Sequence, residues 1–195
     1  GHTEHATLPN HPQDPSFGER QVPITQTLYI EQDDFMEDAP KKFFRLKPGG
    51  EVRLRGAFII RCDEVIHDSE GQVVALRCSF DPESRSGLPG AERKVKGTIH
   101  WVSAEHAVPA RVHLYDRLFN VPHPAGDKAV DFVTHLNPDS VERLDGAMLE
   151  PSLADWPQHT PVQFERLGYF VHDINSLPSQ PVFNRSVTLR DTWAK

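Results

Sequence analysis

The segment 51–60 reads EVRLRGAFII, and its alternation of apolar and charged side chains decides the predicted fold. Val52 and Leu54 would point to one face of a strand and Arg53 and Arg55 to the other, because side chains alternate across a strand. Similar runs recur along the chain, separated by clusters rich in glycine, proline and aspartate. These runs are 21–30, 72–80, 95–103, 110–119, 162–172 and 181–190. The pattern predicts an all-β protein built as barrels or a sandwich, since closure removes exposed strand edges.

Length and composition predict a folded protein of one or two domains. The chain has 195 residues, of which 37% are apolar, and about 150 residues make a typical domain. The longest apolar run, 57–60, is far shorter than the roughly 18 residues that cross a bilayer, and the N-terminus lacks the apolar core of a signal peptide. We therefore expect a cytoplasmic protein with reduced Cys62 and Cys78 and no membrane partner. Short helices fit at 32–37 and 130–136.

The net charge of −7 excludes a protein that coats nucleic acid through its whole surface, because such binding depends on lysine and arginine. The charge is, however, unevenly distributed. Residues 11–40 carry seven acidic side chains against one basic, whereas residues 41–61 carry seven basic against one acidic. A basic stripe on an acidic protein is typical of an anionic partner that docks at one place, and a solvated strand face gives the same pattern.

The motifs of common catalytic and metal sites are missing from the sequence. Cys62 and His67 are the only cysteine and histidine close in sequence, and no second pair completes a tetrahedral zinc site. There is no glycine-rich phosphate loop, no GxSxG and no HExxH. We therefore predict no catalytic residue and no metal site, and we interpret the 11 histidines as structural.

The segment 41–55, KKFFRLKPGGEVRLR, has the chemistry of a single-stranded nucleic-acid site. Arg53 and Arg55 would lie about 7 Å apart on one strand face, and each planar guanidinium can bind a phosphate or a base edge. Two phenylalanines precede Arg45, and aromatic rings beside arginine suit unstacked bases. Alternation would bury at least one of these rings. A second cluster lies at 162–166, where Gln163 and Glu165 share one strand face and the glutamine offers both a donor and an acceptor to a base edge.

Several longer blocks of the sequence carry a family resemblance. They are LPNHP (8–12), EVRLR (51–55), RKVKGTIHWVSAEHAVPARVHLYDRLF (93–119), LNPDS (136–140), EPSL (150–153), VQFERLGYF (162–170) and PVFNRSVTLRDTWAK (181–195). Together they closely resemble the C-terminal anticodon-binding region of bacterial glutaminyl-tRNA synthetases, over nearly the whole chain.

The resemblance implies two β-barrels, closed or partly open, related to the barrel of a ribosomal protein that binds ribosomal RNA. The proximal barrel would comprise residues 1–39 and 121–195, and the distal barrel residues 40–120. Members of the family also have a catalytic half with an HIGH-like loop and an MSK-like loop, and neither motif is present here. We therefore expect a non-catalytic fragment of a glutamine-tRNA ligase, without a cofactor of its own, whose ATP and magnesium belong to the missing half.

The resemblance also implies how an anticodon would be bound. Arg53 and Arg55 would line the pocket for the first base, and Arg45 would read the third. The central uridine and its backbone would be held by Gln163 and Arg166, with Thr192 in the same region. Further RNA contacts are predicted from Lys41 and Lys42.

The partners that follow are the anticodon loop of a glutamine tRNA and the catalytic half in the same chain, and we expect a monomer. Three alternatives remain at this point: the same module of a glutamyl-tRNA synthetase, a β-barrel that binds only protein, and a free-standing enzyme. The lack of a catalytic constellation speaks against the enzyme. Because Val52 and Leu54 would face the core, we expect alanine at Arg45, Arg53 or Arg55 to lower the melting temperature by no more than a few degrees.

Overall fold

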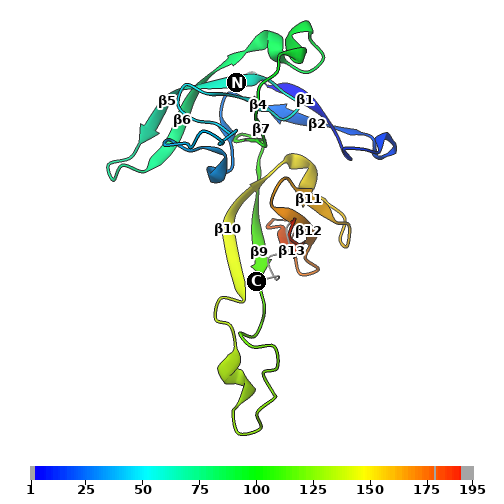
Figure 1. Cartoon of the computed structure of the whole chain (residues 1–195). Helices are drawn as coiled ribbons and strands as arrows, with labels where there is room; N and C mark the ends of the chain where they lie inside the picture. The colour runs from blue at the N-terminus through cyan, green and yellow to red at the C-terminus, as the bar shows by residue number, and fades with distance from the viewer. Residues whose placement is uncertain (1–2, 178, 190–195) are drawn as a thin grey trace. The chain divides into compact units, whose positions relative to one another are not determined.

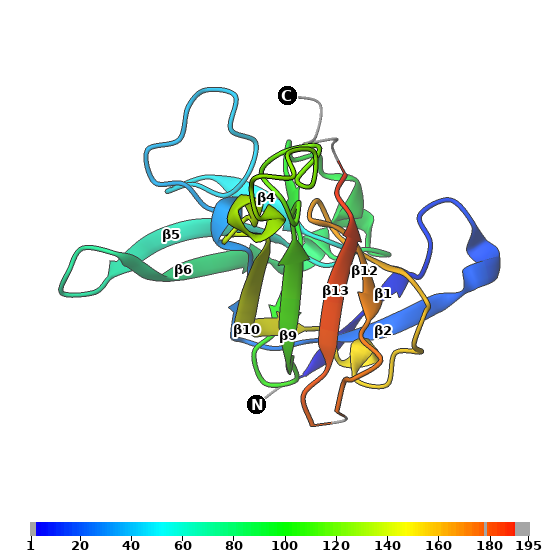
Figure 2. The same cartoon turned by 90° about the horizontal axis from the view of Figure 1, so that it is seen from below.

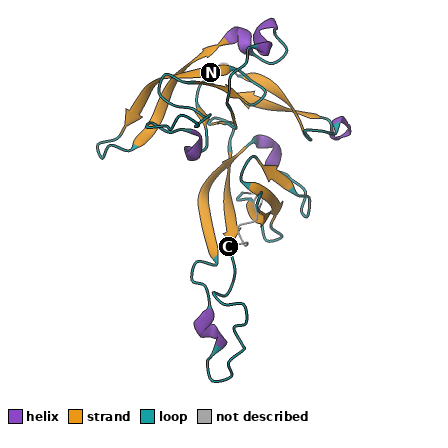
Figure 3. Cartoon of the chain, in the orientation of Figure 1, coloured by secondary structure: helices purple, strands orange, loops and turns teal. Residues whose placement is uncertain are grey.

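Short β-strands make up most of the regular structure in this computed structural model, which describes residues 3–177 and 179–189 (Figures 1 and 3). The helices among these residues are six 3-10 helices of three or four residues each. The prediction of an all-β protein is confirmed. No helix in the described part of the chain is long and apolar enough to cross a membrane. The chain divides into two units, residues 1–107 and residues 108–195, and each is described by itself.

Eight strands lie in the described part of the N-terminal unit, residues 3–107. They are β1 (Glu4–Pro9), β2 (Glu19–Ile24), β3 (Leu28–Tyr29), β4 (Glu51–Leu54), β5 (Ile59–His67), β6 (Val73–Asp81), β7 (Thr98–Ile99) and β8 (Val102–Ser103). The 3-10 helices are η1 (Pro15–Phe17), η2 (Gln32–Asp34), η3 (Pro82–Ser84) and η4 (Pro89–Glu92). The largest sheet has the order β6-β5-β4-β7, with β4 and β7 parallel and the other pairs antiparallel. Two smaller antiparallel pairs, β1-β2 and β3-β8, complete this unit.

The core of the N-terminal unit is a single cluster that takes side chains from the hairpin β1-β2 and from the four-stranded sheet. Leu8 and Val22 of the hairpin belong to the same cluster as Val52, Leu54 and Trp101. Each of these side chains is at most 6% exposed. At about 25 cal/mol for each Å² of apolar surface buried, this cluster is the main source of stability in the unit.

The C-terminal unit, residues 108–195, contains one five-stranded sheet of order β10-β9-β13-β12-β11. The strands are β9 (Val108–Tyr115), β10 (Val141–Leu149), β11 (Val162–Phe164), β12 (Gly168–His172) and β13 (Val182–Val187), and the 3-10 helices are η5 (Phe132–His135) and η6 (Pro151–Leu153). β9 and β13 pair in parallel and lie side by side in Figure 2, whereas the other pairs are antiparallel. This parallel pair joins the hairpin β9-β10 to the strands β11, β12 and β13 in one sheet.

Aromatic rings fill the core of the C-terminal unit. Phe170 and Phe183 are at most 1% exposed. Phe164 stacks on Phe170 with ring centroids 4.3 Å apart, and His172 stacks on Phe183 at 5.1 Å. Such contacts add about 0.5–1.5 kcal/mol each beyond the area that they bury. They fix the hairpin β11-β12, which carries two of the predicted RNA contacts, Gln163 and Arg166.

None of the sheets closes completely among the described residues, which agrees with the partly open form of the expected barrels. The division of the chain falls after Ala107, whereas the expected barrels divide it at 39/40 and 120/121. Within the N-terminal unit, residues 4–24 share a core with residues 46–101, because the apolar face of β1-β2 packs there. The grouping of 1–39 with 121–195 stays a prediction.

Candidate nucleic-acid interface

The basic segment 41–55 consists of an irregular loop followed by β4, and β4 has the predicted alternation. Val52 and Leu54 are buried, Arg53 is half-buried and Arg55 is exposed. Because successive side chains of a strand point to opposite faces, burial of the two apolar residues turns both arginines away from the core. The predicted facing of these four residues is confirmed.

Arg45 is held in place by the η2 segment. Its Nη1 donates a hydrogen bond to the carbonyl oxygen of Asp33 (2.8 Å), and its Nε lies 3.4 Å from a carboxylate oxygen of the buried Asp34. The backbone is fixed as well, since the Leu46 amide donates to the Asp34 carbonyl (2.9 Å) and the Met36 amide donates to the Leu46 carbonyl (3.1 Å). The guanidinium is therefore oriented before any ligand arrives, which lowers the entropy lost on binding.

Arg53 donates four hydrogen bonds to main-chain carbonyl oxygens. Its Nη1 donates to Ser84 (2.6 Å) and Ala57 (3.2 Å), and its Nη2 donates to Ala91 and Arg93 (2.9 Å each). All four donor hydrogens of the two terminal nitrogens are used in this way. Arg53 therefore ties the η3-η4 segment, residues 82–92, to β4.

This geometry changes the expectation for Arg53. An arginine that satisfies four carbonyl groups supports the fold, so its removal will lower the melting temperature by more than the few degrees expected from the strand pattern. Arg93 strengthens the same connection by donating two hydrogen bonds to the Glu51 carboxylate (2.8 and 3.0 Å) and one to Asp81 (3.2 Å). The hydrogen bonds from Arg93 hold the pKa of Glu51 below its ordinary value and raise the pKa of Arg93.

Arg55 has a fixed backbone and an exposed side chain. Its amide donates to the Ile99 carbonyl (3.0 Å), and its carbonyl accepts a hydrogen bond from the indole Nε1 of the buried Trp101 (3.0 Å). Gly56 follows with φ +66°, and a Cβ there would overlap the side chain of Leu8. The chain must therefore turn sharply after Arg55, which leaves that side chain at the end of the strand.

The loop before Arg45 adds two cations and an aromatic ring to this surface. Lys41, Lys42 and Phe44 are exposed, whereas Phe43 is half-buried. The ammonium nitrogen of Lys96 lies over the Phe44 ring, 5.5 Å from its centroid. Sequence reasoning did not identify Lys96, because its proximity depends on the parallel pairing of β4 with β7.

The C-terminal unit carries the second predicted cluster on the hairpin β11-β12. Gln163 is exposed on β11 and pairs in register with Tyr169 of β12. Arg166 lies in the connecting turn with φ +63°, where the Leu167 amide donates to the Phe164 carbonyl (2.9 Å). Gln163 and Arg166 therefore both belong to this short hairpin. Thr192, predicted to act with them, lies outside the described residues.

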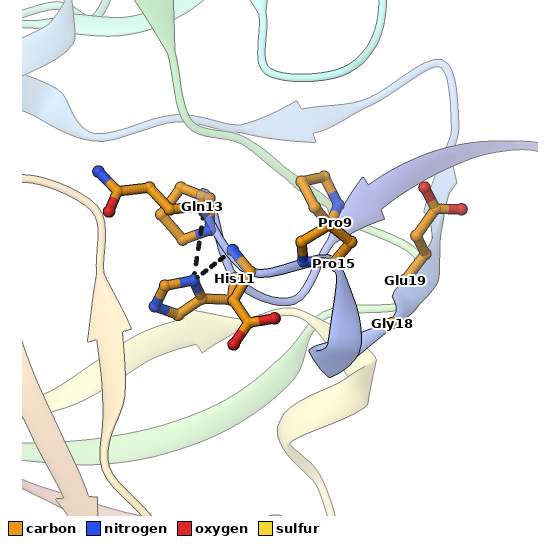
Figure 4. A pocket seen from close by; sticks show the side chains of 8 residues that line it. Pro9, His11, Gln13, Pro15, Gly18 and Glu19 are labelled. Atoms are coloured by element: carbon orange, nitrogen blue, oxygen red, sulfur yellow. Dashed lines mark hydrogen bonds between the residues drawn. The ribbon is translucent and has the colours of Figure 1, made fainter.

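A pocket lies at the tip of the hairpin β1-β2 (Figure 4). His11 accepts hydrogen bonds through Nδ1 from the amides of Gln13 (3.2 Å) and Asp14 (2.9 Å), and its ring stacks on Phe17. The Asp14 carboxylate caps η1 by accepting from the Ser16 amide (2.9 Å), and hydrogen bonds from the Ser16 side chain and from this amide lower the pKa of Asp14. These groups are occupied in shaping the turn, so the pocket offers no paired acid and base for catalysis.

The cysteine and histidine side chains of the described residues form no second candidate site, either catalytic or metal-binding. Cys62 and Cys78 are free thiols that face each other across β5 and β6. Burial raises the pKa of both, to about 12 for Cys78, so neither is a reactive thiolate at neutral pH. Among residues 3–177 and 179–189, no group of three or more histidine, cysteine or acidic side chains could hold a metal ion.

Comparison with known proteins relates both units to one family description, "tRNA synthetases class I (E and Q), anti-codon binding domain". One such domain matches residues 1–81 and another matches residues 98–173. The chain is 55% identical to the glutamine-tRNA ligase of Xanthomonas oryzae pv. oryzae, 53% identical to that of Nitrobacter hamburgensis and 51% identical to that of Bradyrhizobium diazoefficiens. Each similarity covers 100% of this chain and 34% of the relative, so the chain spans about a third of the relatives' length.

Proposed function

Since this chain belongs to the anticodon-binding domains of the class I tRNA synthetases for glutamate and glutamine, we propose that it binds the anticodon loop of a glutamine tRNA. The observation that carries the proposal is the arrangement of Arg45 and Arg55. The Arg45 guanidinium is held by Asp33 and Asp34, the Arg55 backbone donates to Ile99, and both guanidinium groups lie near or at the surface of the basic segment. An arginine fork can make two parallel hydrogen bonds to one base edge, which suits unstacked bases read one at a time.

The proposed roles differ among the predicted residues. Arg45 reads the third anticodon base and Arg55 the first, as the family resemblance implies. Arg53 holds the η3-η4 segment against β4, because its terminal donors are already bound to carbonyl groups. The remaining proposed contacts are Gln163, Arg166 and Thr192 at the central base and Lys41 and Lys42 at phosphates.

We further propose that the module serves a ligase that attaches glutamine to this tRNA with ATP and magnesium. The relatives named glutamine-tRNA ligase are about three times as long as this chain, so the catalytic groups would lie in the part that the chain does not match. The module would act as a cytoplasmic monomer. Its contribution would be to tighten binding of the correct tRNA and so to select the substrate.

The test is binding of anticodon variants, changed one base at a time, to the wild-type chain and to Arg45→Ala and Arg55→Ala. An arginine that reads a base edge should contribute about 1–3 kcal/mol, so Arg45→Ala should remove discrimination at the third position alone and Arg55→Ala at the first alone. Equal loss at every position would make both arginines phosphate anchors and would refute the assignment.

Two further measurements separate the alternatives. A glutamate tRNA and an unrelated tRNA serve as competitors, and preference for the glutamate tRNA would favour a glutamyl-tRNA synthetase. The logarithm of the affinity should fall with the logarithm of the salt concentration with a slope of about −2 to −4, because few phosphates are neutralised. If no tRNA binds with a saturable curve, the proposed function is wrong.

A further inference from the structure

An exposed aromatic ring lies beside the arginine proposed to read the third base. Phe44 is 50% exposed although it precedes Arg45 directly, and the ammonium group of Lys96 lies over its ring. A phenylalanine in this position gains little from burial in the core. Its ring and the cation above it therefore form a surface feature that the packing of the N-terminal unit does not explain.

The structure holds this ring at a defined place. The buried Gly97 packs against the Phe44 main chain so closely that a Cβ at Gly97 would overlap the Phe44 carbonyl oxygen. Gly97 is fixed in turn by the hydrogen bond from the Arg53 amide to its carbonyl (2.9 Å). Just before Phe44 in the chain, the Phe43 amide donates to the Pro40 carbonyl (2.9 Å) and closes a turn. The backbone that carries Phe44 is thus preorganised.

We propose that Phe44 and Lys96 form a stacking platform for one unpaired base of the bound RNA, an inference that rests on the proposed function. Every base has a π face, so an aromatic platform binds bases without regard to their identity. The Lys96 cation lies over one face of the electron-rich ring and adds a positive charge beside the platform, which favours an anionic nucleotide.

Phe44 and its neighbour Arg45 would have different roles in recognition of the RNA. Arg45 is already oriented by Asp33 and Asp34 and can read the edge of a base. Phe44 can take up only the face of a base. Affinity would therefore come mainly from the ring and base identity from the guanidinium, and loss of the ring would weaken all base sequences alike.

The probe is an RNA hairpin with the anticodon arm sequence of a glutamine tRNA, tested intact and with an abasic nucleotide at each loop position in turn. Loss of one stacked base by alanine substitution corresponds to about 5- to 150-fold in affinity. We expect Phe44→Ala and Phe44→Leu to weaken the intact hairpin by an amount in this range, and Phe44→Trp to bind within about threefold of wild type. One abasic position should abolish the difference between Phe44→Ala and wild type.

Two control variants make the experiment specific. Phe17 is 61% exposed at the tip of β1-β2, so Phe17→Ala removes an even more exposed ring elsewhere in the same unit and should leave the affinity unchanged. Lys96→Ala should reduce the slope of the salt dependence by about one, as loss of one phosphate contact does. Thermal melting of each variant checks that the fold is retained.

The outcomes distinguish this inference from the proposed function. If wild type binds the hairpin and Phe44→Ala binds it equally well, the platform is wrong and the anticodon assignment survives. If Phe44→Ala weakens the intact hairpin and every abasic hairpin by the same factor, the ring does not stack on a base and the platform is again wrong. If wild type binds no hairpin, both proposals fail.

Discussion

Replacement of Arg53 by alanine should destabilise the N-terminal unit. The substitution removes a guanidinium that donates to four main-chain carbonyl groups. Three of these bonds are partly buried, and only the bond to Arg93 is exposed. Water can replace the exposed bond, whereas each partly buried carbonyl left without a donor costs about 1 kcal/mol or more. The sum is about 3 kcal/mol.

A loss of this size is easily measured. For a unit of this length, 1 kcal/mol corresponds to about 4–8 °C in melting temperature, so Arg53→Ala should melt about 12–24 °C lower. The assay is thermal unfolding of the full chain, monitored by circular dichroism and by tryptophan fluorescence, to which the buried Trp101 contributes. Arg55→Ala is the matched control, because that side chain is exposed, and it should change stability by less than about 0.5 kcal/mol.

The same variants distinguish a supporting arginine from an RNA contact. Below its melting transition, Arg53→Ala should weaken every anticodon variant to a similar extent, because the segment 82–92 loses its attachment to β4. Arg53→Lys keeps the charge without the planar fork, so it should restore little of the stability. A melting temperature within a few degrees of wild type for Arg53→Ala, together with a loss of discrimination at one base, would refute the supporting role.

Three further changes test other contacts of the structure. Gly97→Ala should lower stability by about 1–3 kcal/mol, because the added methyl group overlaps a main-chain carbonyl, whereas Gly146→Ala, where the methyl meets open space, should be nearly neutral in urea denaturation. Glu51→Gln should lower the melting temperature at neutral pH. Since Arg93 holds the pKa of Glu51 below its ordinary 4.5, the ion pair contributes fully above that pH and is lost as the pH falls through the lowered value, so the two melting curves should converge in acid; a constant difference would contradict this pairing. Cys78, with a pKa of about 12, should react slowly with iodoacetamide at pH 8 in the folded protein and faster as the pH rises or urea is added; rapid reaction at pH 8 would show that its thiol is not buried.

The sequence by itself determined the fold class and the facing of the central basic strand. Alternation in 51–60 placed Val52 and Leu54 inside and the two arginines outside, because a period of two survives in any sheet with one buried face. The expected short helices at 32–37 and 130–136 correspond to the 3-10 helices at Gln32–Asp34 and Phe132–His135. Local chemistry was sufficient for these elements.

Strand β10 shows where local pattern was insufficient. Only one of its nine residues is buried, so it has no apolar alternation to recognise. It is a strand because its main chain pairs with β9, with a bulge between Leu144 and Ala147. Main-chain hydrogen bonding leaves no pattern in the side chains of a strand, and the partner strand β9 is distant in the sequence. The sequence pattern therefore does not predict β10.

Tertiary structure alone decided the roles within the basic segment. In sequence, Arg53 and Arg55 are equivalent members of one strand face. Carbonyl groups of Ser84, Ala91 and Arg93 accept hydrogen bonds from Arg53. Lys96, from the same stretch of chain, lies over the ring of Phe44. Arg55 remains exposed, because the turn at Gly56 ends the strand. Strand alternation determines which way a side chain points, but only long-range packing determines which groups that side chain contacts.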